Sequence, residues 1–212
     1  QIDSHMRFRP NWDAYLIEHL PSGKSMFTTY PVGYKLPNQI PEETRPTLLV
    51  PWKFDSSGML RQRGHLLPDI SSGPIPTQLY AAGFNFAPGS SISDCPYPTY
   101  RVFFGEEVYR AIQFHEQGYE LWSPPETVAY HLWSRSHRPV FQADGIHDDR
   151  NKIQKFFDEN VSESIWNRMG VDWKNKKIKQ DASLSMQIQP NRFVEWVDGD
   201  VGLSFSDMEE TP

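Results

Sequence analysis

The sequence has a single cysteine, Cys95, among its 212 residues. One thiol excludes an intrachain disulfide framework and a zinc site built on several thiolates. Positive charge is also scarce, because 21 Lys and Arg stand against 27 Asp and Glu, for a formal net charge of −6. A chain without a basic surplus is a poor candidate for wrapping DNA or RNA, so we expect no nucleic-acid partner.

Long apolar runs are missing as well. The longest uncharged segment, residues 70–93, has 24 residues, of which ten are apolar, and Pro, Gly and Ser interrupt it. Such a segment cannot cross a bilayer as a helix, so we expect no membrane segment in this chain. The single cysteine favours a cytoplasmic location. A Golgi location stays open, because the chain begins QIDSHMRF without an initiator Met.

Aromatic residues and proline are abundant. Aromatic side chains make up 14% of the chain, and 18 prolines are about 8% of it, against a usual value of about 5%. Apolar residues, at 38%, suffice for a core and exclude wholesale disorder. The composition favours a loop-rich fold held by large aromatic side chains, with aromatic surfaces for sugar rings as the alternative.

Hydrophobic periodicity predicts helices and strands along the chain. Helices are expected from the Asn11 cap to Leu20 before Pro21, from Gly105 to a C-terminal Gly118, and over 149–160 and 162–169. Strands are expected over 25–34, 79–87, 119–125 and 127–134, with a hairpin of 47–54 and 59–67 around the turn at Asp55–Gly58. This mixture predicts an α/β class with a mixed sheet flanked by helices.

Asp3-Ser4-His5 follows an apolar pair at the start of the chain. If a strand ends there, residues i and i+2 face one side, and a carboxylate with an imidazole can bind one divalent metal. A chance triplet in a surface loop is the alternative. His131, between Tyr130 and Leu132, is either a hydrogen-bonded core histidine or a third ligand for the same ion.

Two carboxylates, Glu106 and Glu107, open the helix after Gly105. The positive end of the helix dipole favours them there, which makes ordinary helix-start chemistry one interpretation. The other is a carboxylate aimed into a site, with Gly105 leaving room for a ligand. The turn 83–89 has neither G-x-G-x-x-G nor a Walker lysine, so it does not indicate a phosphate cradle.

Several motifs occur in a specific order: QIDSHMRF, TTYPVGY, AAGFNFAPG, DCPY and FFGEEVYRAIQFHEQGYELWSPPETVAYHLWSR. This series resembles the cytosolic protein-hydroxyproline N-acetylglucosaminyltransferases, whose known acceptor is the small adaptor subunit of cullin ubiquitin ligases. It is distantly similar to the mucin-type polypeptide GalNAc transferases. The resemblance runs from Gln1 to about Phe141, and a weaker similarity is found in MGVDW.

The resemblance implies a GT-A fold and a metal-dependent, retaining transfer of N-acetylglucosamine from UDP-GlcNAc to a protein hydroxyl, hydroxyproline. It implies that Asp3, His5 and His131 hold manganese or magnesium. Glu106 would face the donor sugar and acceptor, and Glu107 stands where the mucin-type enzymes carry Asn; both are catalytic candidates. The residues expected to line the donor and acceptor sites are Gly83, Phe84, Asn85, Gly105, Trp133 and Arg135.

By the same resemblance, residues 1–145 form the metal-, donor- and acceptor-binding part, and residues 146–212 form a helical extension with a mobile tail. The N-terminal nucleotide-binding half is then expected to be missing. The strand ending at Ile2 is expected to be central and buried on both faces.

Two other functions remain. A catalytically inactive glycan- or protein-binding module would have the same fold. A metallophosphoesterase also uses D-x-H, but it needs Gly-Asp and Gly-Asn-His motifs for a second metal, and this chain has no Gly-Asn-His.

Overall fold

Helices and strands are mixed along the chain, as the periodicity predicts. The structure is a computed structural model that describes residues 1–97, 99, 105–134 and 149–179. Its helices are α1 (Trp12–His19), α2 (Ser90–Asp94), α3 (Glu106–Glu116), α4 (Arg150–Asn160) and α5 (Glu163–Arg168). Its strands are β1 (Met6–Phe8), β2 (Ser25–Thr28), β3 (Val32–Gly33), β4 (Thr47–Phe54), β5 (Leu60–Leu66), β6 (Ile75–Thr77), β7 (Asn85–Phe86), β8 (Glu120–Ser123), β9 (Ala129–His131), β10 (Val171–Asp172) and β11 (Lys177–Ile178). The mixed α/β class is confirmed.

The described strands form four small sheets rather than one mixed sheet. Their orders are β6-β8-β2-β7, β1-β9-β3, β4-β5 and β10-β11. The β2–β8 and β3–β9 pairs are parallel, and the other pairs are antiparallel. The expected strand 25–34 divides into β2 and β3, which lie in different sheets. Pro31 between them lacks the N–H that a continuous ladder requires.

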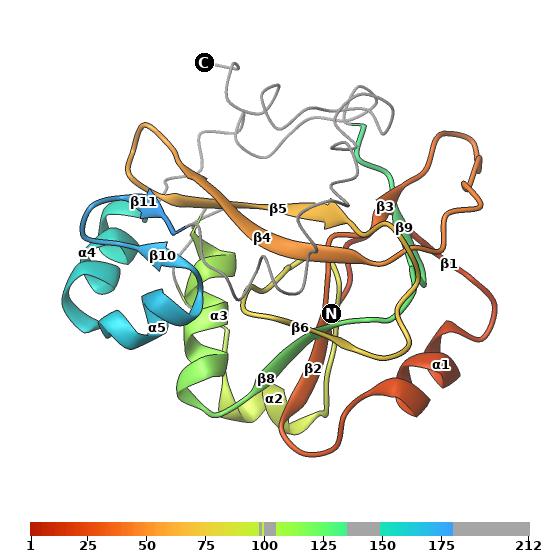
Figure 1. Cartoon of the computed structure of the whole chain (residues 1–212), viewed down its shortest axis with the longest axis horizontal. Helices are drawn as coiled ribbons and strands as arrows, with labels where there is room; N and C mark the ends of the chain where they lie inside the picture. The colour runs from red at the N-terminus through yellow and green to blue at the C-terminus, as the bar shows by residue number, and fades with distance from the viewer. Residues whose placement is uncertain (98, 100–104, 135–148, 180–212) are drawn as a thin grey trace.

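Strand β2 lies between α3 and α1 (Figure 1), and it contributes to two hydrophobic clusters. Met26 joins a large cluster with α3, α4 and α5, whereas Phe27 joins a second cluster with Leu16 of α1. Both side chains are fully buried. Successive strand residues point to opposite faces, so one short strand connects the two halves of the core.

Helix α3 has the ends that its glycines predict. Gly105 precedes it with φ 117°, and Gly118 follows with φ 75°, both in the region that favours glycine. The Gly118 and Tyr119 amides donate to the carbonyls of His115 and Phe114, at 3.1 and 2.8 Å. The glycines therefore fix where this helix starts and stops, and they set the position of the carboxylates in its first turn.

Five of residues 79–87 are buried and the other four are partly buried, but only Asn85–Phe86 is a strand. Side chains, rather than a neighbouring strand, form many of the hydrogen bonds to the backbone N–H and C=O groups of this segment. The Ala81 amide donates to Thr28 Oγ1, at 2.7 Å, and the Tyr80 carbonyl accepts from Gln62 Nε2, at 2.6 Å. Because these partners already fill the backbone positions, a regular ladder does not form.

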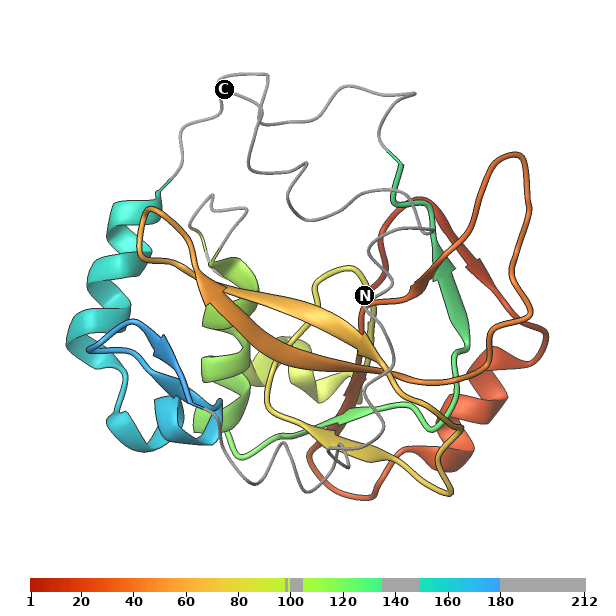
Figure 2. The same cartoon turned by 45° about the horizontal axis from the view of Figure 1, so that its top comes forward.

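Helices α4 and α5 pack into the same core as α3, on the side away from α1 (Figure 2). Phe157 and Trp166 are buried there, and the Trp166 ring stacks on Trp173 with centroids 4.4 Å apart. Both helices were predicted from periodicity. The expected mobile tail, after Gly202, lies outside the described residues.

One local prediction holds in position only, and another is wrong. Asn11 stands at the N-cap of α1, as predicted, but its backbone is left-handed, with φ 58°, and its side chain makes no capping bond. Ile2 is not part of a central buried strand: it forms one antiparallel bridge with Phe84, and it is 53% exposed.

Candidate metal centre

Three candidate ligands from distant parts of the sequence meet at one edge of the β1-β9-β3 sheet. Antiparallel pairing of β1 with β9 puts Met6 opposite His131, so His5 lies beside the end of β9. The Leu132 amide donates to the His5 carbonyl, at 3.1 Å, and closes this end of the pair. Asp3 is held from the other side, where its amide donates to the Gly83 carbonyl, at 2.9 Å.

The geometry of this cluster fits a single metal ion. The ligand atoms of Asp3, His5 and His131 all lie within 4.8 Å of one another. Asp3 Oδ2 lies 3.0 Å from His131 Nε2 and 3.7 Å from His5 Nε2. Two atoms that each lie about 2.1 Å from one ion at a right angle are about 3.0 Å apart, so small side-chain movements bring all three into a coordination shell. The structure therefore brings the predicted ligands together.

Burial and charge also suit a divalent cation. The side chain of His131 is 6% exposed and that of His5 15%, whereas Asp3 is 43% exposed, so the cluster is open on one side. Partial burial raises the pKa of Asp3, but the Ser4 amide and His131 outweigh it and hold this pKa below its usual value. One carboxylate and two neutral imidazoles carry a charge of −1, which leaves cation charge for an anionic ligand.

Within the described residues, no second group of three or more His, Cys, Asp or Glu side chains has ligand atoms this close together. A two-metal phosphoesterase site therefore lacks its second ligand set in this part of the chain.

Aromatic rings form a wall behind His131. The Trp133 ring lies 4.2 Å from the His131 ring, and its indole N–H donates to the Pro31 carbonyl, at 3.0 Å. The Tyr30 ring meets Trp133 edge-on, with centroids 5.9 Å apart. Trp133 was predicted to line the site, whereas Tyr30 was not singled out, and its position in the quoted TTYPVGY motif is the only signal that pointed to it.

Glu106 and Glu107 point to different partners. Glu106 accepts a hydrogen bond from the Tyr97 hydroxyl. Burial and the neighbouring Glu107 charge raise the pKa of Glu106 to about 7, and Arg110 opposes this shift. Gln1, two residues before Asp3, connects the Glu106–Tyr97 pair to the metal cluster. Its side-chain amide donates to the Tyr97 hydroxyl, at 3.4 Å.

Glu107 does not cap its own helix. Its carboxylate accepts hydrogen bonds from the Tyr30 hydroxyl, from Gln62 Nε2 at 3.1 Å and from the Ala82 amide at 2.8 Å. Burial raises the pKa of Glu107, while the bonds from Tyr30 and Ala82 act to lower it. Nothing in the sequence around Gln62 singled it out.

The other predicted binding residues surround the same region. The Gly83 carbonyl holds Asp3, and Asn85 is bound to the chain's first residue, with its carbonyl 2.9 Å from the Gln1 amino group. Phe84 is fully buried in the cluster beneath α1. Gly105 precedes α3, and Arg135 lies outside the described residues.

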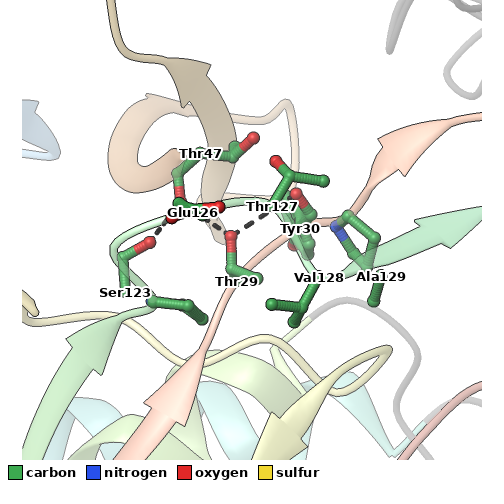
Figure 3. Close-up of a pocket in the computed structure, with 10 residues that line it drawn as sticks. Thr29, Tyr30, Thr47, Ser123, Glu126, Thr127, Val128 and Ala129 are labelled. Carbon is green, nitrogen blue, oxygen red and sulfur yellow. Dashed lines mark hydrogen bonds between the residues drawn. The ribbon is translucent and has the colours of Figure 1, made fainter. Parts of the chain in front are cut away.

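A pocket between β2 and the segment before β9 is a separate feature (Figure 3). The hydroxyls of Thr29 and Ser123 both donate to the Thr47 carbonyl, at 2.7 Å, beside it. The enclosed space holds about one water molecule, which is too small for a sugar. It therefore does not compete with the metal cluster as a substrate site.

No helix in the described ranges has the length and apolar character that crossing a membrane requires. A comparison with curated proteins gives no match. The family model described as glycosyltransferase (GlcNAc) matches residues 1–191, nearly the whole chain and all the candidate ligands. The chain belongs to this glycosyltransferase family.

Proposed function

We propose that this protein transfers N-acetylglucosamine from UDP-GlcNAc to a protein hydroxyl, with hydroxyproline as the acceptor group. The observation that carries the proposal is the convergence of Asp3, His5 and His131 within 4.8 Å, in a chain that belongs to a glycosyltransferase family. The resemblance to protein-hydroxyproline transferases supports the finer choice of sugar and acceptor, including an adaptor subunit of a ubiquitin ligase. It also supports a cytoplasmic location.

In this proposal, Asp3, His5 and His131 hold manganese or magnesium. The bound ion acts as a Lewis acid that stabilises negative charge on the UDP leaving group. The exposed side of Asp3 leaves the approach open for the donor diphosphate. Trp133 excludes water behind His131, and the two imidazoles stay neutral so that their nitrogens donate lone pairs.

Glu106 orients the donor sugar or the acceptor hydroxyl at the start of α3. A retaining transfer in which the acceptor attacks from the leaving-group face requires no strong protein base, so we assign Glu106 a positioning role. Tyr97 holds one oxygen of its carboxylate. The catalytic-candidate role of Glu107 is treated separately, because its contacts differ.

The test is release of UDP from UDP-GlcNAc by the purified full-length protein that contains these residues, with and without a hydroxyproline peptide. We expect release that depends on Mn²⁺ or Mg²⁺, stops with EDTA, and attaches one hexosamine mass to the peptide. The matched acceptor control is the same peptide with proline, and UDP-GalNAc is the donor control. Metal-loaded protein that releases no UDP above the EDTA control would contradict the proposal and favour an inactive binding module.

A further inference from the structure

The carboxylate of Glu107 accepts donors from three segments far apart in the chain. The Tyr30 hydroxyl follows β2, Gln62 lies on β5, and the Ala82 amide lies between β6 and β7. A glutamate that served only the helix would bond to first-turn amides or remain in solvent. The location of Glu107 between these segments indicates that it joins α3 to the rest of the site.

One connection runs through the backbone to Asp3. Glu107 Oε1 holds the Ala82 amide, and the next residue, Gly83, accepts the Asp3 amide on its carbonyl. The same strip of chain continues as the bridge between Phe84 and Ile2. The segment that fixes the backbone of Asp3 is therefore itself fixed by Glu107.

A second connection runs through aromatic rings to His131. Glu107 Oε2 holds the Tyr30 hydroxyl, the Tyr30 ring meets Trp133 at 83°, and Trp133 contacts the His131 ring. This route shares no residue with the first except Glu107. Two candidate ligands, on separate segments, thus depend on one carboxylate.

The geometry points to Glu107 as a positioning residue. It sets the distance between Asp3 and His131, and this distance sets the affinity of the site for the metal. The Glu107 carboxylate bonds to Tyr30, Gln62 and Ala82 and to neither ligand, so we assign it a positioning role rather than a catalytic one. This inference rests on the metal centre in the proposed function. It distinguishes two adjacent glutamates: Glu106 acts on substrate, and Glu107 acts on the ligands.

Glu107→Gln is the variant that tests it. A carboxylate accepts all three donors, but an amide has one acceptor oxygen, and its NH₂ must face a donor. An outer partner of a metal ligand typically contributes 10–100-fold in affinity, and Glu107 is one or two contacts further out along its two routes, so we expect about a tenfold rise in the Mn²⁺ dissociation constant. Tyr30→Phe cuts the aromatic route alone and keeps the ring, so we expect a smaller rise of a few-fold. Glu116→Gln, an exposed position at the other end of α3, is the matched control.

Free Mn²⁺ is measured by electron paramagnetic resonance on each purified variant without donor, with circular dichroism to confirm folding. High Mn²⁺ should restore the transfer rate of Glu107→Gln, which a purely structural defect would not allow. Wild-type affinity in folded Glu107→Gln overturns the positioning role and leaves the proposed function intact. If Glu107→Gln does not fold, unchanged affinity in Tyr30→Phe overturns it. A wild-type chain that does not bind Mn²⁺ overturns both.

Discussion

Replacing Glu106 with Gln should remove the pH dependence of sugar transfer that comes from this carboxylate. The substitution keeps the length and the hydrogen-bonding oxygen of the side chain and removes its charge. Because burial and Glu107 raise the pKa of Glu106 to about 7, this carboxylate titrates within the working pH range. Its ordinary pKa of 4.5 would leave it ionised throughout that range.

The size of the effect follows from that value. With a pKa of about 7, Glu106 is ionised in about a tenth of molecules at pH 6 and about nine tenths at pH 8. If the ionised form is the active one, kcat/KM rises about tenfold between these pH values, since this ratio reports the free enzyme. A group that orients substrate contributes about 10–100-fold, so we expect Glu106→Gln to lose that much at pH 8 and to show a flat profile.

The assay is kcat/KM for UDP release from pH 5.5 to 8.5 at saturating Mn²⁺. Saturating metal keeps His5 and His131 liganded, so that their protonation does not imitate the titration of Glu106. Mn²⁺ affinity should stay at the wild-type value, which separates this variant from Glu107→Gln. If kcat/KM of Glu106→Gln still rises with pH as it does in the wild type, the reasoning is refuted, because another group would then be titrating.

Three more outcomes are expected. His131→Ala should weaken Mn²⁺ binding at least about 10–100-fold, whereas the control His19→Ala on α1 should bind Mn²⁺ as the wild type does. Equal Mn²⁺ dissociation constants for the two variants would remove His131 from the ligand set. Gly64→Ala should lower the free energy of unfolding by about 1–3 kcal/mol in urea titrations, because its Cβ would lie 2.6 Å from Thr47 Cγ2, whereas Gly73→Ala, with open space, should change little. Burial lowers the pKa of His115 from 6.5 to about 4, so the folded state favours the neutral ring. The contribution of His115 to the free energy of unfolding is therefore complete above pH 6.5, and it is lost as the pH falls through about 4. His115→Gln, which can still donate to the Gln78 carbonyl, should lose less stability between pH 7 and pH 4 than wild type does.

Local patterns predicted the helices because their determinants are local. The expected apolar side of α1 is the side that packs: Leu16 is fully buried, and Ile17, one position on, is 68% exposed. Gly105 and Gly118 marked the ends of α3 correctly, since each takes a positive φ. Asn11 does stand at the N-cap of α1, but its backbone is left-handed and its side chain makes no capping bond, since a preference for a residue type does not fix that conformation.

Strand partners could not be predicted, because they depend on residues far along the chain. Residues 79–87 have the composition of a buried strand, and all of them are buried or partly buried. Their amides and carbonyls are nevertheless taken by Thr28, Gln62 and Glu107 rather than by a ladder. The division of 25–34 between two sheets likewise depends on the separate pairing of β2 with β8 and β3 with β9.

The site shows the same limit at the scale of single residues. From its apolar neighbours alone, His131 had two interpretations, and the register that puts it opposite Met6, beside His5, favours the ligand. Adjacent helix residues are rotated by about 100°, so the sequence does require Glu106 and Glu107 to diverge. The period also turns Glu107 toward the buried face of the helix, because Ala111 and Phe114, four and seven residues further on, are buried. It does not identify the partners: donors of Tyr30, Gln62 and Ala82 surround Glu107, and Glu106 is left to Tyr97. Two identical side chains at one helix end thus acquire different chemistry from partners that no local pattern identifies.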